Sequence, residues 1–170
     1  RRTLCRSPSP DPQETPRDRG HLQYVDLPDA SVVTTRALLT ARENIKWYSP
    51  YDDRYVDGPR GLDIDHLVPL AEAWDSGAYA WTAKEREDYA NDLGDERALI
   101  AVSAASNRSK ADQDPSTWLP PAQGYRCQYV TDWIADKTRW GLSIDATEEA
   151  ALTGELIRCP NAPITVTTAR

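Results

Sequence analysis

The stretch that decides the fold is Leu62-Asp63-Ile64-Asp65-His66-Leu67-Val68-Pro69. Apolar and polar residues alternate from Leu62 to Val68, which is typical of a half-buried β-strand. Pro69 then ends the strand, because proline cannot donate to a ladder of backbone hydrogen bonds. Side chains in a strand repeat every two residues, so Asp63 and Asp65 share one face. We therefore expect a strand whose end carries two carboxylates and a histidine.

The sequence downstream predicts a second strand followed directly by a short helix. Residues 97–102 are mostly apolar, and a helix starts at Ser103 or Ala104. Asp114-Pro115 ends that region, since the residue before a proline avoids the helical conformation. Asn107 and Lys110 are three residues apart, and so they lie on the same face of the helix.

Five further segments are predicted to be helical, and one of them has a clear start signal. Thr82 and Glu85 match the capping box that opens helices. Residues 47–61, which hold two prolines and two glycines, indicate a loop or a short hairpin. The expected fold class is α+β, a mainly helical domain with a short two-stranded antiparallel hairpin. The five segments are residues 35–42, 69–75, 82–93, 125–139 and 145–159.

The length of 170 residues suits one domain with a real core. Residues 1–20 are rich in proline and arginine and indicate a flexible arm. We expect a single domain over residues 21–170, with the strand–strand–helix unit at about 60–115 and C-terminal helices at about 124–159. The chain has no Phe and no Met, so its six Trp and eight Tyr must supply the bulky core packing.

Composition restricts the class of protein. No run of 18 or more apolar residues occurs, which predicts no membrane span. The chain opens with Arg1 and Arg2 rather than Met, as expected of a processed or trimmed chain. The net charge of −7 argues against a protein that coats nucleic acid, because such binding is mostly phosphate neutralisation. It does not exclude an enzyme that contacts one or two phosphates through a metal ion.

The three cysteines are Cys5, Cys127 and Cys159. They form no CxxC pattern, so a structural zinc site is not expected. We pair Cys127 with Cys159 as a disulfide between two helices, which implies an oxidising compartment and a secreted protein. The alternative is two buried free thiols. Cys5 is then left over, as a free thiol, an intermolecular link or the remnant of a trimmed pair.

The polar groups around the first strand suit phosphodiester hydrolysis. The chain has only two histidines, so few side chains are available as a neutral base near pH 7. Asp and Asn side chains supply the oxygen ligands that a hard cation such as Mg²⁺ prefers. An imidazole can take a proton from water as it attacks phosphorus. A lysine or arginine nearby can stabilise the developing charge.

At these residues the sequence resembles the HNH endonucleases, also called ββα-metal or His-Me finger enzymes. More narrowly, it resembles the secreted actinobacterial group related to the GmrSD C-terminal domain. The resemblance covers roughly residues 60–160, and residues 1–60 match poorly. It rests on residues 63–69, 73–74, 89–93, 99–103, 107–110 and 112–118, together with Cys127 and Cys159.

The resemblance implies a role for each matching residue. His66 falls on the general base, and Asp65 and Asn107 fall on metal ligands. The middle position of the motif is often an asparagine that orients the histidine, but here Ala98 stands just before Leu99. A backbone carbonyl would then have to orient the ring.

We expect Lys110 to take part in catalysis and, with Arg108, to contact the phosphate. The expected cofactor is a divalent metal, Mg²⁺ first, with Mn²⁺ and Ca²⁺ as alternatives. A second candidate histidine is His21, in Asp18-Arg19-Gly20-His21, which matches another branch of ββα-metal nucleases. It lies in the proline-rich arm with no strand signal before it, so we favour His66.

Three functions remain open from the sequence. The first is a monomeric, secreted endonuclease that cuts DNA, and also RNA, with low sequence specificity. The second is a nuclease toxin domain of a larger delivered protein, with an inhibitor or immunity protein as partner. The third is a catalytically inactive nucleic-acid-binding module. The acidic charge favours the third function, and the intact Asp65, His66 and Asn107 oppose it.

Overall fold

The computed structural model describes residues 46–170. The predicted arm at residues 1–20, the predicted helix at 35–42, Cys5 and the alternative histidine His21 lie outside the described residues. The domain boundary predicted at residue 21 therefore stays a prediction.

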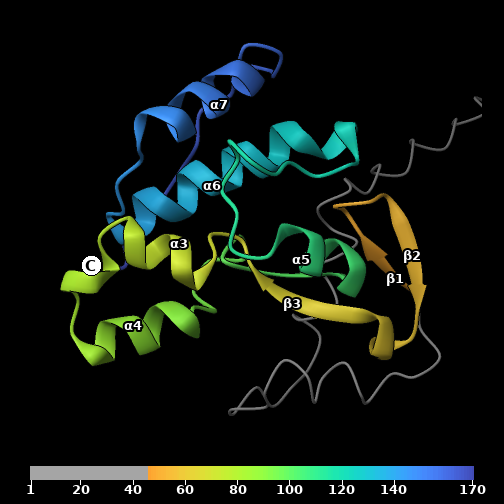
Figure 1. Ribbon diagram of the computed structural model, residues 1–170, viewed down its shortest axis with the longest axis horizontal. Helices are drawn as coiled ribbons and strands as arrows, with labels where there is room; N and C mark the ends of the chain where they lie inside the picture. Colours follow the sequence, from red (N-terminus) through yellow and green to blue (C-terminus); the bar gives the residue numbers. More distant parts are fainter. Residues whose placement is uncertain (1–45) are drawn as a thin grey trace, which may run out of the picture.

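The described chain opens with a hairpin and continues into a strand–strand–helix unit (Figure 1). Strands β1 (Lys46–Ser49) and β2 (Arg54–Asp57) pair antiparallel. After a 3-10 turn, η1 (Pro59–Gly61), strand β3 (Leu62–His66) pairs antiparallel with β4 (Leu99–Ser103). Helix α5 (Ala104–Lys110) follows β4 without a loop and lies against this second sheet.

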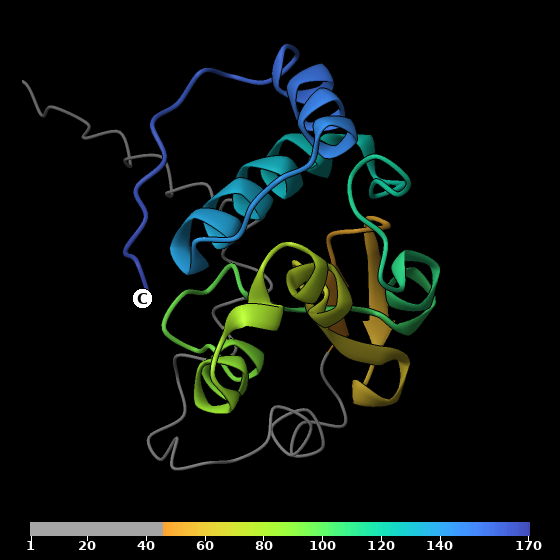
Figure 2. The same ribbon diagram turned by 60° about the vertical axis from the view of Figure 1, so that its left-hand side comes forward.

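Two short helices fill the connection between β3 and β4. Helix α3 (Leu70–Asp75) begins directly after Pro69. A 3-10 turn, η2 (Ala78–Ala80), leads to helix α4 (Ala83–Ala90). The predicted capping box is present, with Thr82 accepting from the Glu85 amide and Glu85 accepting from the Thr82 amide. Both helices lie at the end of β3 that is remote from the β1–β2 hairpin (Figures 1 and 2).

The C-terminal half is built on the longest helix of the described residues. A 3-10 turn, η3 (Gln123–Tyr125), leads into α6 (Arg126–Trp140), which Gly141 ends in the left-handed conformation. Helix α7 (Ala146–Leu156) starts at Asp145, whose side chain accepts from two amides of the first turn. Helix α7 packs on α6. The segment after it returns along α6, where Arg97, Arg139 and the Ala169 amide make hydrogen bonds that hold it.

The core is aromatic, as the absence of Phe and Met predicts. Rings of Tyr and Trp contact one another in a chain of tilted and edge-on pairs, which suits aromatic quadrupoles. Most of these rings lie in one cluster, and Trp47 belongs to a smaller cluster under the hairpin. Three aromatic residues are largely exposed instead, namely Tyr55, Trp74 and Tyr79. The buried aromatic residues of the main cluster are Tyr51, Trp81, Tyr89, Tyr129, Trp133 and Trp140.

Cys127 and Cys159 form a disulfide, as the sequence analysis predicts. Cys127 lies in the first turn of α6, and Cys159 lies three residues beyond the end of α7. The bond therefore fastens the exit of α7 to the start of α6.

The predicted α+β, mainly helical fold class is confirmed. The structure differs in detail, because its described residues hold two separate two-stranded sheets. Helix α4 ends at Ala90, three residues before the predicted end, because Asn91 leaves the helical conformation. Among the described residues, no helix combines the length and apolarity needed to cross a bilayer.

Candidate functional site

Strand β3 and helix α5 bring together the predicted site residues Asp65, Asn107, Arg108 and Lys110, with Asp63 beside them. Asp63 and Asp65 share the strand face that α5 covers, and Asn107 and Lys110 share the helix face that meets it. At the outer position, the Asn107 side-chain nitrogen lies 3.4 Å from Asp63 Oδ2. Arg108 Nε lies 3.8 Å from the same oxygen, and the Arg108 side chain is 78% exposed. This end of the site is open to solvent.

At the inner position, Asp65 is buried and accepts two hydrogen bonds. Lys110 Nζ donates to Asp65 Oδ2 at 2.6 Å, and the Tyr51 hydroxyl donates to the same oxygen at 2.6 Å. Among the described residues, both hydrogen bonds that Asp65 receives fall on Oδ2, so its Oδ1 is left for another partner.

The electrostatics of this pair follow from burial. Burial raises the pKa of Asp65, while Lys110, the Tyr51 hydroxyl and the nearby His66 ring oppose the rise. Burial also raises the pKa of Tyr51 well above its usual value, so the phenol keeps its proton and remains a donor. The two buried charges of this pair, on Asp65 and Lys110, therefore stabilise each other.

Lys110 is fully buried, at 0% exposure. Its ammonium group also donates to the backbone carbonyl of His66 at 2.8 Å. This position does not support the prediction that Lys110 contacts the phosphate. Its ammonium group donates to Asp65 and to the His66 carbonyl, away from solvent. The physical reason is that α5 packs directly on β3, so the Lys110 side chain is enclosed between the helix and the strand.

His66 ends β3 and points its ring toward α4. Its Nε2 lies 2.9 Å from the carbonyl oxygen of Ala90, and the ring stacks over Tyr89 at a centroid distance of 6.4 Å. A carbonyl can only accept, so Nε2 carries the proton and Nδ1 presents a lone pair. The expectation that a backbone carbonyl replaces the missing asparagine agrees with this contact. Ala98 itself extends the sheet, where its carbonyl accepts from the Leu67 amide.

The β1–β2 hairpin fixes the start of α5. Ser103 caps α5, and its backbone amide donates to the Ser49 hydroxyl at 2.9 Å. The Ser103 hydroxyl also donates to Asp52 Oδ2 at 2.7 Å. Tyr51 belongs to the same turn, so the hairpin places both the cap of α5 and the hydroxyl on Asp65.

The donor set can be compared with what a metal ion needs. Among residues 46–170, no three His, Cys, Asp or Glu side chains converge as a metal cluster. The oxygen-bearing side chains present are two carboxylates, Asp63 and Asp65, and the Asn107 amide. Asn107 directs its nitrogen at Asp63, which turns its oxygen outward as an acceptor. Such oxygen donors fit Mg²⁺, which keeps several waters and binds through one or two carboxylates together with substrate phosphate.

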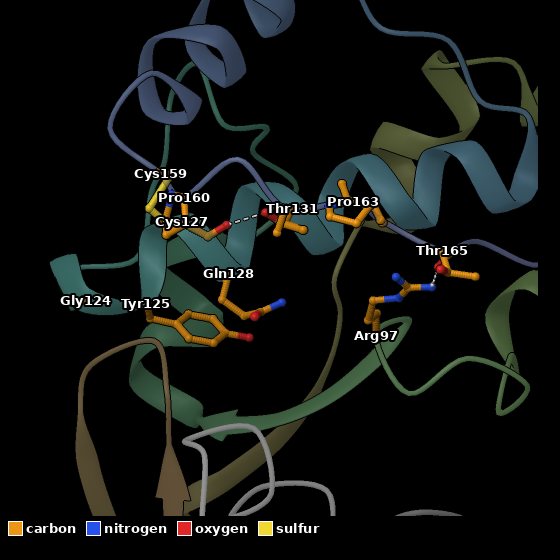
Figure 3. A pocket seen from close by; sticks show the side chains of 12 residues that line it. Arg97, Gly124, Tyr125, Cys127, Gln128, Thr131, Cys159, Pro160, Pro163 and Thr165 are labelled. Carbon is orange, nitrogen blue, oxygen red and sulfur yellow. Dashed lines mark hydrogen bonds between the residues drawn. A yellow bond between two sulfur atoms is a disulfide. The ribbon is translucent and has the colours of Figure 1, made fainter.

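A pocket of about 900 Å³ lies elsewhere, between the start of α6 and the returning C-terminal segment (Figure 3). Prolines, threonines and the disulfide line much of it, and none of the predicted catalytic or metal-binding residues does. Arg97 is its one charged lining residue, and Asp95 already pairs with that guanidinium. The pocket therefore offers little chemistry, and the β3–α5 site remains the candidate.

Sequence reasoning missed three contributors to the site. Tyr51 lies in a stretch that predicts only a loop or hairpin, and nothing in its spacing marks it as a partner of Asp65. Ala90 contributes only a backbone carbonyl, which no side-chain pattern reveals. Tyr89 lies on the predicted helix but carries no separate signal.

The fold and the site define an α+β protein with a polar strand–strand–helix unit around one histidine. Residues 29–155 match the model of the family described as GmrSD restriction endonucleases, C-terminal domain. The chain belongs to this family.

A curated relative extends the comparison. The chain is 45% identical, over 113 residues, to a protein of Arthroderma benhamiae named "Uncharacterized secreted protein". The match covers 66% of this chain and 55% of the relative, so the chain spans about half the length of that protein. No solved structure matches the chain.

Proposed function

We propose that the chain is a metal-dependent endonuclease of the HNH type that hydrolyses DNA with low sequence specificity, and that His66 is its general base. RNA is a second substrate to be tested. The observation that carries the proposal is the contact from His66 Nε2 to the Ala90 carbonyl. It fixes the tautomer in which Nδ1 is free to accept a proton from water, as a general base requires.

The same site offers a place for a divalent ion. Asp65, through Oδ1, and Asn107, through its side-chain oxygen, would hold Mg²⁺, with Mn²⁺ or Ca²⁺ as alternatives. When bound, the ion supplies Lewis-acid stabilisation of the phosphate oxygens and the leaving oxygen. Asp65 keeps its negative charge beside Lys110, and His66 keeps its ring fixed against α4.

Two cations near the site take different roles. Arg108 is exposed at the open end of the site and is proposed to contact a substrate phosphate. Lys110 is proposed to act through Asp65 and the His66 backbone as a positioning residue. Neither role requires the chain to be basic overall, because few phosphates are neutralised.

We also propose that the protein is secreted. The name of the Arthroderma benhamiae relative and the Cys127–Cys159 disulfide support this location, since disulfides persist in oxidising compartments.

Cleavage of plasmid DNA and of RNA tests the proposal, with Mg²⁺ and with chelator. His66→Ala should lower the cleavage rate by about 10²–10⁴-fold, the usual contribution of a general base. His21→Ala is the matched control and should cut like the parent chain. Equal cleavage by His66→Ala and the parent would remove His66 from the mechanism. Cleavage in the presence of the chelator would exclude the metal ion from the proposed mechanism.

A further inference from the structure

Two aromatic side chains stand exposed beside the site although most of the aromatic residues are buried. Trp74 is 49% exposed, Tyr79 is 63% exposed, and their rings meet edge-on at a centroid distance of 6.5 Å. Leu70 lies one turn before Trp74 on α3 and is 50% exposed as well. Large apolar side chains gathered on one surface mark a binding site more often than single exposed residues do.

A guanidinium completes this surface. The Arg86 side chain lies over the Trp74 ring at 5.5 Å from the centroid, and its Nη1 donates to the Trp81 carbonyl. Arg86, which belongs to α4, is therefore held by the Trp81 carbonyl while it stacks on the indole of α3. An ordered aromatic ring beside an ordered cation is the combination that single-stranded nucleic acids use for stacking and charge contacts.

The surface lies on the two helices that are next to His66 in the fold. Helix α3 begins four residues after His66, and α4 ends at the carbonyl that holds His66 Nε2. Arg86 and Ala90 are one turn apart on α4, about 6 Å along the helix axis. A strand of nucleic acid a few nucleotides long would therefore span from the histidine to Trp74.

The charge of the surface favours bases over phosphates. Asp75 is exposed beside Trp74, and Lys84 on α4 is paired with Asp88. Acidic neighbours repel a phosphate backbone, whereas the faces of the rings remain open to unpaired bases. Bases inside a duplex are stacked on each other and cannot offer their faces.

We propose that Trp74, Tyr79 and Arg86 form a platform on which bases of a single-stranded nucleic acid stack. This inference rests on the proposed endonuclease function and names its substrate as single-stranded or locally unpaired nucleic acid.

Fluorescence anisotropy of a fluorescein-labelled single-stranded oligonucleotide, with and without its complement annealed, tests the platform. The measurement uses the His66→Ala chain in Mg²⁺, so that the oligonucleotide is not cleaved. Adding Trp74→Ala and Tyr79→Ala should weaken single-strand binding by about tenfold or more, since stacking contributes substantially per base. Trp74→Phe, in place of Trp74→Ala, keeps an aromatic ring and should preserve most of the single-strand affinity. Tyr55→Ala, an exposed aromatic of the β1–β2 hairpin, is the matched control and should change nothing.

Single-strand affinity that survives the double substitution would overturn the platform. An equal loss for single strand and duplex would overturn the preference for unpaired bases. Cleavage by the parent chain is read separately: a chain that never cuts removes the proposed function, while the binding series still decides whether the platform exists.

Discussion

Two fully buried lysines, Lys137 and Lys110, make different contacts in two parts of the molecule. Lys137 on α6 lies among Glu72, Glu148 and the Ser76 hydroxyl, at 2.6–2.8 Å, and also reaches the Ser143 carbonyl. Lys110 on α5 meets a single carboxylate, Asp65, and one strand carbonyl. We call these groups the Lys137 cluster and the Lys110 cluster.

The two clusters differ in how many carboxylates share the ammonium group and in which elements they join. In the Lys137 cluster, two carboxylates share one ammonium group and join α3, α6 and the first turn of α7, and Glu72, like Asp65, receives both of its hydrogen bonds on one oxygen. In the Lys110 cluster, one carboxylate oxygen receives two donors and the other receives none among the described residues. The first arrangement fastens helices together, whereas the second lies between β3 and α5, where we propose that Asp65 Oδ1 binds an ion.

Lys110→Met gives the largest expected effect. It leaves Asp65 buried without its cation, which should cost about 3–5 kcal/mol of unfolding free energy. It should also lower cleavage per folded molecule by about 10–100-fold, since partners of a metal ligand have effects of that size. Urea unfolding and plasmid cleavage measure the two effects. Cleavage per folded molecule equal to the parent would contradict the positioning role.

Lys137→Met is the matched substitution in the scaffold. It leaves Glu72 and Glu148 without their shared cation, so a loss of about 3–5 kcal/mol is expected here too. Cleavage per folded molecule should stay at the parent level, because no group of the Lys137 cluster belongs to the candidate site. A fall in cleavage as large as that of Lys110→Met would erase the distinction between the clusters.

Asp136, the neighbour of Lys137 on α6, offers a further comparison because it is a buried carboxylate to which no side chain among the described residues donates a hydrogen bond. Burial, with Asp92 and Asp95 nearby, raises its pKa to about 7. The folded state therefore binds this proton more tightly than the unfolded state. The stabilising contribution is complete below about pH 4 and is lost as the pH rises to about 7.

Asp136→Asn should remove this dependence and stabilise the protein above pH 7, by up to about 4 kcal/mol. Urea unfolding of both chains across pH 4–8 measures the difference. A difference that does not change with pH would show that Asp136 does not titrate in this range.

Tyr51→Phe gives a smaller effect and has a close control. It removes the hydroxyl that donates to Asp65, so we expect about tenfold slower cleavage and about 1 kcal/mol of lost stability. Tyr129 is equally buried and contacts the Tyr51 ring, but its hydroxyl has no hydrogen-bond partner in the described chain. Tyr129→Phe should therefore leave cleavage and stability unchanged. Equal effects of the two substitutions would show that Tyr51 contributes only through ring packing and not through its hydrogen bond to Asp65.

Local patterns made much of the fold predictable from the sequence. The alternation around Ile64 and the capping box at Thr82 each act over a few residues, and the structure agrees with both of them. The Cys127–Cys159 pair was predictable because both lie near the ends of predicted helices. These signals depend on neighbours in the chain.

The environment of the site was not predictable in the same way. The contacts of Asp65 with Tyr51 and Lys110, and of His66 with Ala90, join residues 14 to 45 positions apart. They depend on how separate elements pack, and no periodicity encodes that packing. A lysine three residues after an asparagine looks solvent-facing in sequence, yet the packing of α5 on β3 buries it.

The central claim is that His66 is the base while Asp65 and Asn107 hold the ion. Calorimetric titration of Mn²⁺ into the parent, His66→Ala and Asn107→Ala chains separates these roles most directly. We predict that His66→Ala binds Mn²⁺ like the parent but does not cut nucleic acid. Asn107→Ala should bind Mn²⁺ at least about tenfold more weakly, which corresponds to a loss of about 1.4 kcal/mol in binding free energy. Loss of Mn²⁺ binding in His66→Ala, with Asn107→Ala unaffected, would contradict the claim and make the histidine the ligand.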